Sequence, residues 1–186
     1  MHILTLLGSP RRRGNTATVL HCFEQHIASP HTLEHLDIMK YTVHGCLGCE
    51  HCQKVFDAPG CRQHDDALAI FERMSAADLL VYATPLYCWD FTAQLKALID
   101  RHYCLIKWHA PRGKFSLWAG KRAALLVTCG DPVENNADLI QTVFRRQMDA
   151  LDAAVAGIYI LPQCSLPSQL GNRAAELGER MAGELL

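Results

Sequence analysis

The sequence predicts an α/β fold in which a parallel sheet is covered by helices on both faces. Three observations support this prediction. Short apolar runs alternate with helical patterns along all 186 residues. The first run, at 2–7, ends in a glycine- and arginine-rich turn just before a helical pattern. Hydrophobic residues make up 49% of the chain, which is enough for a buried core. Strands that alternate with helices are normally parallel and joined by right-handed crossovers.

Five strands are expected. Residues 2–7 and 78–83 are continuous apolar runs, which are typical of strands buried on both faces. Residues 32–38 mix apolar with polar side chains and therefore indicate an edge strand. Residues 122–128 and 155–161 complete the sheet.

Helices are expected between these strands, because apolar side chains recur there at helical spacing. Their predicted ranges are 15–27, 65–74, 92–103, 135–151 and 169–185. A long irregular stretch at about 41–64 contains four cysteines, and loops of this length are usually functional. We find no internal repeat or linker, so residues 1–186 are expected to form a single domain.

The composition argues against several classes of function. The formal net charge is -1, with 18 basic and 19 acidic residues, so the chain lacks the basic field of a nucleic-acid-binding protein. No apolar run is long enough for a membrane helix, and no secretory signal is visible. We therefore expect a cytoplasmic protein. In that compartment nine cysteines favour thiolate or metal chemistry over disulfides.

The turn at 8–16 has the composition of an anion site. A strand-to-helix turn gathers free backbone N–H groups at the positive end of a helix. Ser9, Asn15 and Thr16 add side-chain donors, and Arg11 and Arg13 add positive charge. Neither the P-loop pattern nor the dinucleotide fingerprint is present. An ordinary solvated basic loop is the alternative interpretation.

These residues resemble the phosphate loop of the NAD(P)H-dependent FMN reductase and flavodoxin-like superfamily. The resemblance continues at 46–52 with Cys61, at 84–87 and at 96–101, and it covers about the first half of the chain. It is closest to the iron–sulfur flavoproteins and their cluster-free relatives. It implies a flavodoxin-like three-layer sandwich with a five-stranded parallel sheet of order 2-1-3-4-5. It also implies bound FMN, NAD(P)H as electron donor, and a homodimer or homotetramer.

On this resemblance FMN would contact the turn at 8–16, the loop at 84–89 and the strand end at 128–131. Tyr87 and Trp89 offer aromatic faces for the flavin ring, although single aromatic residues more often serve packing. The expected cofactor-binding residues are Ser9, Arg11, Arg13, Gly14, Asn15, Thr16, Thr84, Pro85, Leu86, Tyr87, Cys88, Trp89, Thr128, Gly130 and Asp131. The flavin would carry the chemistry, so no catalytic side chain is expected.

The cysteine-rich loop holds Cys46, Cys49 and Cys52 at two-residue gaps, with Cys61 further on. This spacing resembles runs that ligate a [4Fe–4S] cluster. Eight residues separate Cys52 from Cys61, whereas iron–sulfur flavoproteins usually have a shorter gap. A zinc site and a loop without metal remain open. The loop is expected at the same sheet end as the flavin, where electrons could pass between them. The other cysteines are expected to be small apolar residues: Cys22, Cys88, Cys104, Cys129 and Cys164.

Three functions fit the sequence. The first is an FMN-dependent oxidoreductase that takes electrons from NAD(P)H or a ferredoxin-like donor and reduces quinones, flavins or other small acceptors. The second is an electron-transfer flavoprotein with FMN and a [4Fe–4S] cluster, without a substrate pocket of its own. The third is a non-enzymatic flavin- or metal-binding module. Trp108, Phe115 and Trp118 belong to a segment that is expected to be a subunit surface, a lid or a packed loop.

Overall fold

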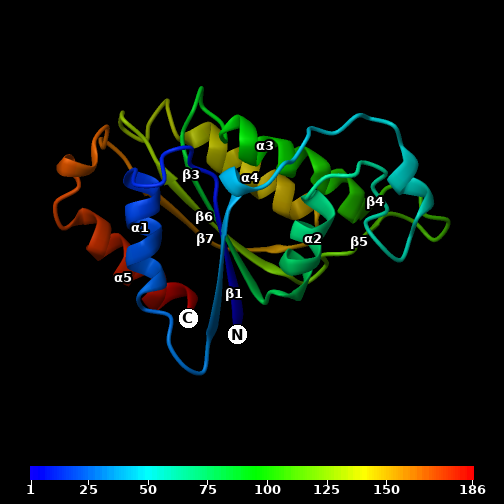
Figure 1. Cartoon of the computed structure of the whole chain (residues 1–186), viewed down its shortest axis with the longest axis horizontal. Coiled ribbons are helices and arrows are strands. Elements are labelled where there is room, and N and C mark those ends of the chain that lie inside the picture. Colours follow the sequence, from blue (N-terminus) through cyan, green and yellow to red (C-terminus); the bar gives the residue numbers. More distant parts are fainter.

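The computed structural model describes residues 1–186 and is built around a five-stranded parallel sheet (Figure 1). The strands run in the order β2 (Thr32–Asp37), β1 (His2–Leu7), β3 (Leu79–Pro85), β6 (Arg122–Thr128) and β7 (Ala154–Leu161). Every neighbouring pair is parallel. Counted along the main sheet, this is the predicted order 2-1-3-4-5. The strand with mixed polarity, β2, lies at an edge, as predicted.

Helices cover both faces of the sheet. One face packs against α2 (Ala67–Ala76), α3 (Ala93–Asp100) and α4 (Asp138–Ala150), and the other against α1 (Asn15–Glu24) and α5 (Arg173–Leu185). Successive strand residues point to opposite faces, so alternate residues of one strand enter different cores. In β1, for example, Leu4 and Leu6 pack under α2 and α3, whereas Ile3 and Leu7 pack under α1. This explains why the central strands are apolar throughout.

Several helices are shorter than predicted. The helix predicted at 92–103 leaves the α conformation after Asp100 and continues as the 3-10 turn η3 (Arg101–Leu105). There Arg101 turns inward to an ion pair with Asp65. The last predicted helix begins only at Arg173, after the 3-10 turn η4 (Pro167–Gln169). Side-chain pairing and short turns of this kind leave no periodic trace in the sequence.

A two-stranded antiparallel ribbon was not predicted. It pairs β4 (Ile106–Lys107) with β5 (Phe115–Ser116), and strands of two residues are too short to show alternation. Directly after it, Trp118 is fully buried and donates its indole N–H to Ser75 Oγ at 3.1 Å. Of the three alternatives for this segment, the structure supports the packed loop at Trp118 and not a subunit surface. Trp108 and Phe115 are exposed.

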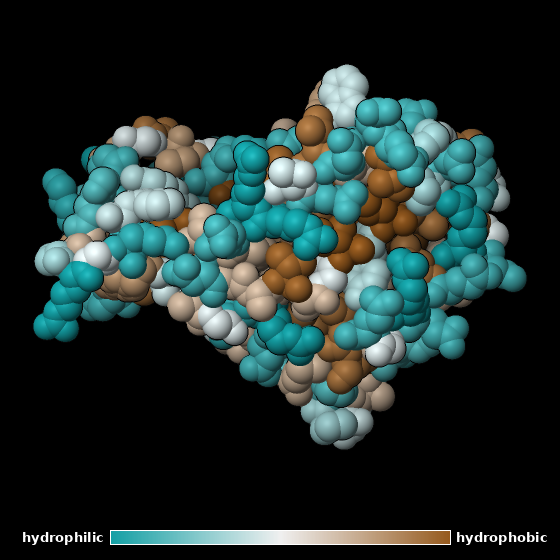
Figure 2. Space-filling model, turned by 180° about the vertical axis from the view of Figure 1, so that it is seen from behind, coloured by the Kyte–Doolittle hydropathy of each residue, from teal (hydrophilic) through white to brown (hydrophobic).

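The loops that follow β1, β3, β6 and β7 gather at one edge of the sheet, at the upper left of Figure 1. The cysteine-rich loop starts at this edge after the 3-10 turn η1 (Ile38–Lys40). It then crosses to the far side of the molecule, where η2 (His51–Lys54) lies near the β4–β5 ribbon. Seen from behind, hydrophobic residues gather mainly on the half that holds the strand-end loops, on the right of Figure 2. None of the helices has the length and apolar character needed to cross a bilayer.

Candidate functional site

A cleft of about 550 Å³ opens between the strand-end loops. Its volume falls in the range of small-molecule sites. The first loop, the loop after β3, the end of β6 and the loop after β7 each contribute to its lining. The lining residues are Ser9, Arg11, Arg13, Gly14, Asn15, Thr16, Pro85, Leu86, Tyr87, Thr128, Cys129, Gly130, Cys164, Ser165 and Pro167.

The floor of this cleft is the N-terminus of α1. Gly14 is the N-cap and offers no capping side chain, so the N–H groups of Asn15, Thr16 and Ala17 donate no hydrogen bond within the protein. The hydroxyl of Thr16 lies 2.7 Å from that of Thr128. Free N–H groups at the positive end of a helix, next to two hydroxyls, form a site for an anion.

The arginines of the first loop divide between two roles. Arg11 and Arg13 line the cleft, whereas Arg12 turns toward Asp37, with Nε 3.4 Å from the carboxylate. The loop is closed by bonds from the Gly14 N–H to the Arg11 carbonyl at 2.9 Å and from the Arg11 N–H to Ser9 Oγ at 3.2 Å. A Cβ on Gly14 would lie 2.9 Å from the Arg11 Cβ, so this tight turn requires glycine.

The loop after β3 forms a strained two-residue hairpin turn beside the cleft. Tyr87 and Asp90 exchange two backbone hydrogen bonds of 3.0 Å. Between them, Cys88 and Trp89 have φ angles of 48° and 64°, a left-handed conformation that asparagine and glycine normally occupy. The turn is anchored to the first loop, because Thr92 Oγ1 donates to the Gly8 carbonyl at 2.6 Å. Trp89 is 57% exposed.

Four of the predicted cofactor residues do not line the cleft. Thr84 is fully buried and donates to the carbonyl of Pro85 at 2.8 Å. Cys88 and Trp89 sit at the tip of the turn, and Asp131 lies beyond the lining. Sequence reasoning missed the loop after β7, which contributes Cys164, Ser165 and Pro167, and it treated Cys129 and Cys164 as packing residues. The loop after β7 could have been predicted to line the cleft, because it also follows a parallel strand and therefore lies at the same edge of the sheet as the other strand-end loops.

The cleft residues fit FMN. A terminal phosphate would match the unpartnered N–H groups of α1 and the two arginines at the rim. Asn15 donates through Nδ2 to the Cys164 carbonyl, while its buried Oδ1 has no partner and is free to accept a ribityl hydroxyl. Buried acceptors rarely stay unpaired in proteins, so this atom itself points to a ligand that carries donors.

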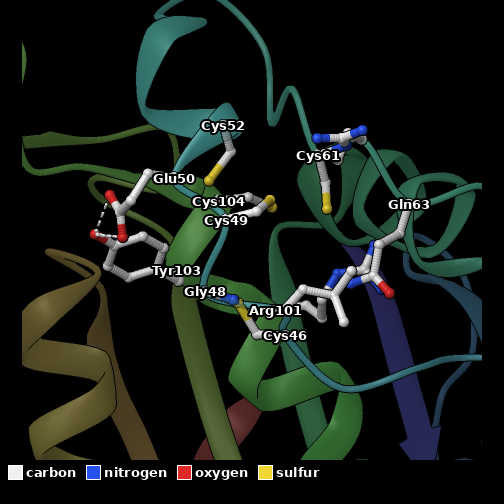
Figure 3. A pocket seen from close by; sticks show the side chains of 12 residues that line it. Cys46, Gly48, Cys49, Glu50, Cys52, Cys61, Gln63, Arg101, Tyr103 and Cys104 are labelled. Atoms are coloured by element: carbon white, nitrogen blue, oxygen red, sulfur yellow. Dashed lines mark hydrogen bonds between the residues drawn. The ribbon is translucent and has the colours of Figure 1, made fainter.

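A second cavity lies in the cysteine-rich loop (Figure 3). Cys46, Cys49, Cys52 and Cys61 all line it, and Cys104 of η3 joins them. Cys104 had been expected to serve only as a packing residue. No three metal-binding side chains in the structure converge closely enough to hold one metal ion. A [4Fe–4S] cube takes one thiolate at each of four separate irons, and thiols spread around a cavity fit that requirement.

A buried ion pair borders the cysteine cavity. Arg101 Nη1 lies 2.8 Å from Asp65 Oδ2, and both side chains are almost fully buried. Burial alone would raise the pKa of Asp65, but the bonds from Arg101 and from the His44 and Ala67 N–H groups lower it. The Nε of Arg101 is buried without a partner. Tyr103 donates to Glu50 at 3.0 Å, and burial together with that carboxylate raises the pKa of Tyr103 to about 12.

The two cavities lie at opposite ends of α3. Thr92, which precedes the helix, bonds to the first loop beside the cleft, whereas Arg101, Tyr103 and Cys104, which follow it, line the cysteine cavity. An eight-residue helix is about 12 Å long. The expectation that the cysteines lie at the flavin end of the sheet is therefore wrong, because the loop carries them across the face of the molecule (Figure 1).

Comparison with solved structures supports the fold. An FMN-dependent NADH-azoreductase from Bacillus anthracis in complex with FMN superimposes with a TM-score of 0.67 at 16% identity, and covers 100% of this chain and 99% of its own. An NAD(P)H:quinone oxidoreductase from Methanothermobacter marburgensis superimposes with a TM-score of 0.67 at 20% identity, and the match covers 97% of this chain and 96% of the oxidoreductase. At these identities the likeness is one of fold.

Sequence comparison finds iron–sulfur flavoproteins of Archaeoglobus fulgidus. One is 34% identical over 102 residues, which are 54% of this chain and 48% of the relative. Another is 26% identical over 189 residues, which are 98% of this chain and 79% of the relative. The chain thus spans about half the length of several curated relatives that it matches. The family model for NADPH-dependent FMN reductase matches residues 1–160. The chain therefore belongs to the NADPH-dependent FMN reductase family.

Proposed function

We propose that this protein binds FMN in the strand-end cleft and passes electrons from NAD(P)H to a small acceptor such as a quinone or free flavin. The observation that carries the proposal is the uncapped N-terminus of α1 at the floor of the cleft, with hydroxyl and arginine donors around it. When bound, FMN supplies the redox chemistry. Family membership and the quinone oxidoreductase and azoreductase folds support this class of acceptor.

The protein's own residues would bind and orient the cofactor. The N–H groups of 15–17 and the hydroxyls of Ser9 and Thr16 would hold the phosphate, while Arg11 and Arg13 would balance its charge. The loop at 85–87 and the backbone around Gly130 border the remaining space, where the ring would lie. Burial raises the pKa of Cys129 to about 11, so its thiol stays protonated near neutral pH and acts as a lining group rather than a nucleophile.

Enzyme assays on the flavin-loaded protein test this function. The protein is incubated with FMN, desalted, and mixed with NADH or NADPH and a soluble naphthoquinone or free flavin. We expect a flavin absorbance that survives desalting and a consumption of NAD(P)H that depends on the acceptor. Retention of FMN without any such consumption would favour a non-enzymatic flavin-binding module. Failure to retain FMN would contradict the proposal.

A second candidate function rests on the cysteine cavity. We propose that it holds a [4Fe–4S] cluster and that the protein exchanges electrons with a ferredoxin-like partner, as a homodimer or homotetramer. The five cysteines around one cavity and the similarity to iron–sulfur flavoproteins support this candidate. Anaerobic purification followed by iron and sulfide analysis tests it. We expect about four irons per chain, and a chain without iron and sulfide would exclude the cluster.

A further inference from the structure

Lys107 is a buried lysine behind the cysteine cavity. It lies in β4, and its side chain is fully buried. Its ammonium donates three hydrogen bonds, to the carbonyls of Cys52 at 3.2 Å, Pro59 at 3.1 Å and Cys104 at 2.8 Å. All three acceptors are neutral. Lysine is almost never fully buried unless it is paired, so this residue calls for an explanation.

Two of these bonds close the part of the loop that departs from the family pattern. The eight residues 53–60 separate Cys52 from Cys61. Lys107 binds the carbonyl of the residue before this segment and that of Pro59 near its end, so a single ammonium draws the two ends together. Despite the length of this segment, Cys52 and Cys61 line the same cavity (Figure 3).

Two neighbours of Lys107 reinforce the closure. Gln53 is buried and donates through Nε2 to the carbonyls of Tyr103 at 3.1 Å and Ile106 at 2.9 Å, which fixes η2 to the β4 segment. Gly60 has a φ of 64° and packs on Val55, where an added Cβ would lie only 2.5 Å from the Val55 Cβ. The segment is therefore folded into one shape by specific contacts.

The charge of Lys107 also needs a counterpart. A buried charge is costly unless an opposite charge compensates it, and carbonyl dipoles do so only in part. The groups that can carry negative charge near it are the thiols of Cys104 and Cys52, whose backbones it already holds, and the exposed carboxylate of Asp57. Thiolates that ligate metal are anionic, so a cavity filled by a thiolate-bound cluster would place further negative charge beside the ammonium, away from solvent.

We propose that Lys107 is the positioning residue of the cysteine cavity, closing residues 53–60 so that Cys61 enters it and compensating the charge of an anionic iron–sulfur cluster. The inference rests on the second candidate function. Both the assembly and the reduction potential of the cluster would then depend on a residue outside the cysteine motif, because net charge around a cluster sets its potential.

The test compares Lys107→Met and Lys107→Gln with Lys54→Met, a matched control in which an exposed lysine of η2 is removed. Each protein is reconstituted anaerobically with ferrous iron and sulfide and desalted. Iron, sulfide and FMN are then measured, and the cluster potential is determined by spectroelectrochemistry. We expect both Lys107 variants to retain less iron than wild type, with a more negative potential in the fraction that assembles. Lys54→Met should match wild type in both.

The FMN content separates folding from assembly, because the cleft lies at the other end of α3. If Lys107→Met does not fold, Lys107→Arg keeps the charge and, compared with Lys107→Gln, should hold the less negative potential. Wild-type protein that takes up no iron would remove the cluster proposal and this inference with it. Wild-type protein that loads normally, with Lys107 variants of equal iron content and equal potential, would overturn this inference and leave the cluster proposal standing.

Discussion

At the scale of single residues, the proposed phosphate site depends on a few donors with no other role. Thr16 is 1% exposed, and its hydroxyl meets only that of Thr128. Replacing Thr16 with valine keeps the shape and removes one donor. A hydrogen bond to a charged group contributes roughly 1.5–3 kcal/mol, so FMN should bind about tenfold to a hundredfold more weakly.

The matched control for this variant is Thr18→Val, two residues further along α1 and outside the cleft lining, where the hydroxyl donates to the Gly14 carbonyl. Flavin fluorescence titration measures both affinities. Thr18→Val should bind FMN like wild type. Equal affinities for the two variants would mean that Thr16 does not contact the phosphate.

A second prediction concerns His35 and the dependence of stability on pH. Hydrogen bonding to Glu24 at 2.7 Å raises the pKa of His35 above its usual 6.5, against the effect of burial. A histidine whose pKa is raised in the folded state contributes its full stabilisation at a pH below the pKa of the unfolded state. That stabilisation is lost as the pH rises through the pKa of the folded state. Because His35 is 37% exposed, the contribution is at most about 1 kcal/mol.

Urea unfolding of wild type and His35→Gln between about pH 5.5 and 8.5 tests this point. The stability advantage of wild type should be largest at the acidic end and should shrink as pH rises. A stability advantage of wild type that grows with pH would show that the bond to Glu24 does not raise the pKa of His35.

At the scale of elements, α1 and α5 approach closely through a glycine. A Cβ on Gly178 would lie 2.7 Å from the backbone nitrogen of Phe23, so Gly178→Ala must push the helices apart and should destabilise the protein by about 1–3 kcal/mol. Gly183 lies in the same helix with open space around it. Gly183→Ala should therefore stabilise by about 0.5–1 kcal/mol through helix propensity. Thermal unfolding compares the two, and a shift of the same sign in both would contradict this packing.

The hairpin turn after β3 gives a second prediction at this scale. Left-handed backbone costs a residue with a side chain about 1–2 kcal/mol, and glycine escapes that cost. Because Trp89 is mostly exposed, Trp89→Gly should raise the midpoint of thermal unfolding. Trp108→Gly removes another exposed tryptophan whose φ is ordinary, so it should not. A lower midpoint for Trp89→Gly would mean that the ring packs more than its exposure indicates.

For the whole molecule, the alternation of apolar runs and helical patterns was sufficient to predict the parallel sheet, whereas its strand order came from the family resemblance. The part of the first loop that lines the cleft was predictable, because a strand-to-helix turn gathers free N–H groups and Ser9, Asn15 and Thr16 add side-chain donors there. The β4–β5 ribbon and Lys107 were not predictable, because two-residue strands show no alternation and a lysine looks like a surface residue. Nor did the sequence reveal that residues 41–64 cross the molecule, since that path depends on the Arg101–Asp65 pair and the contacts of Gln53.

We propose above that the cleft at the N-terminus of α1 recognises the phosphate of FMN. Equilibrium titration of the flavin-free protein with FMN and with riboflavin tests it most directly, because the two ligands differ only in that group. We predict that FMN binds at least about a hundredfold more tightly than riboflavin, and that the difference shrinks in Thr16→Val. Equal affinity for the two flavins would mean that this cleft does not bind the phosphate.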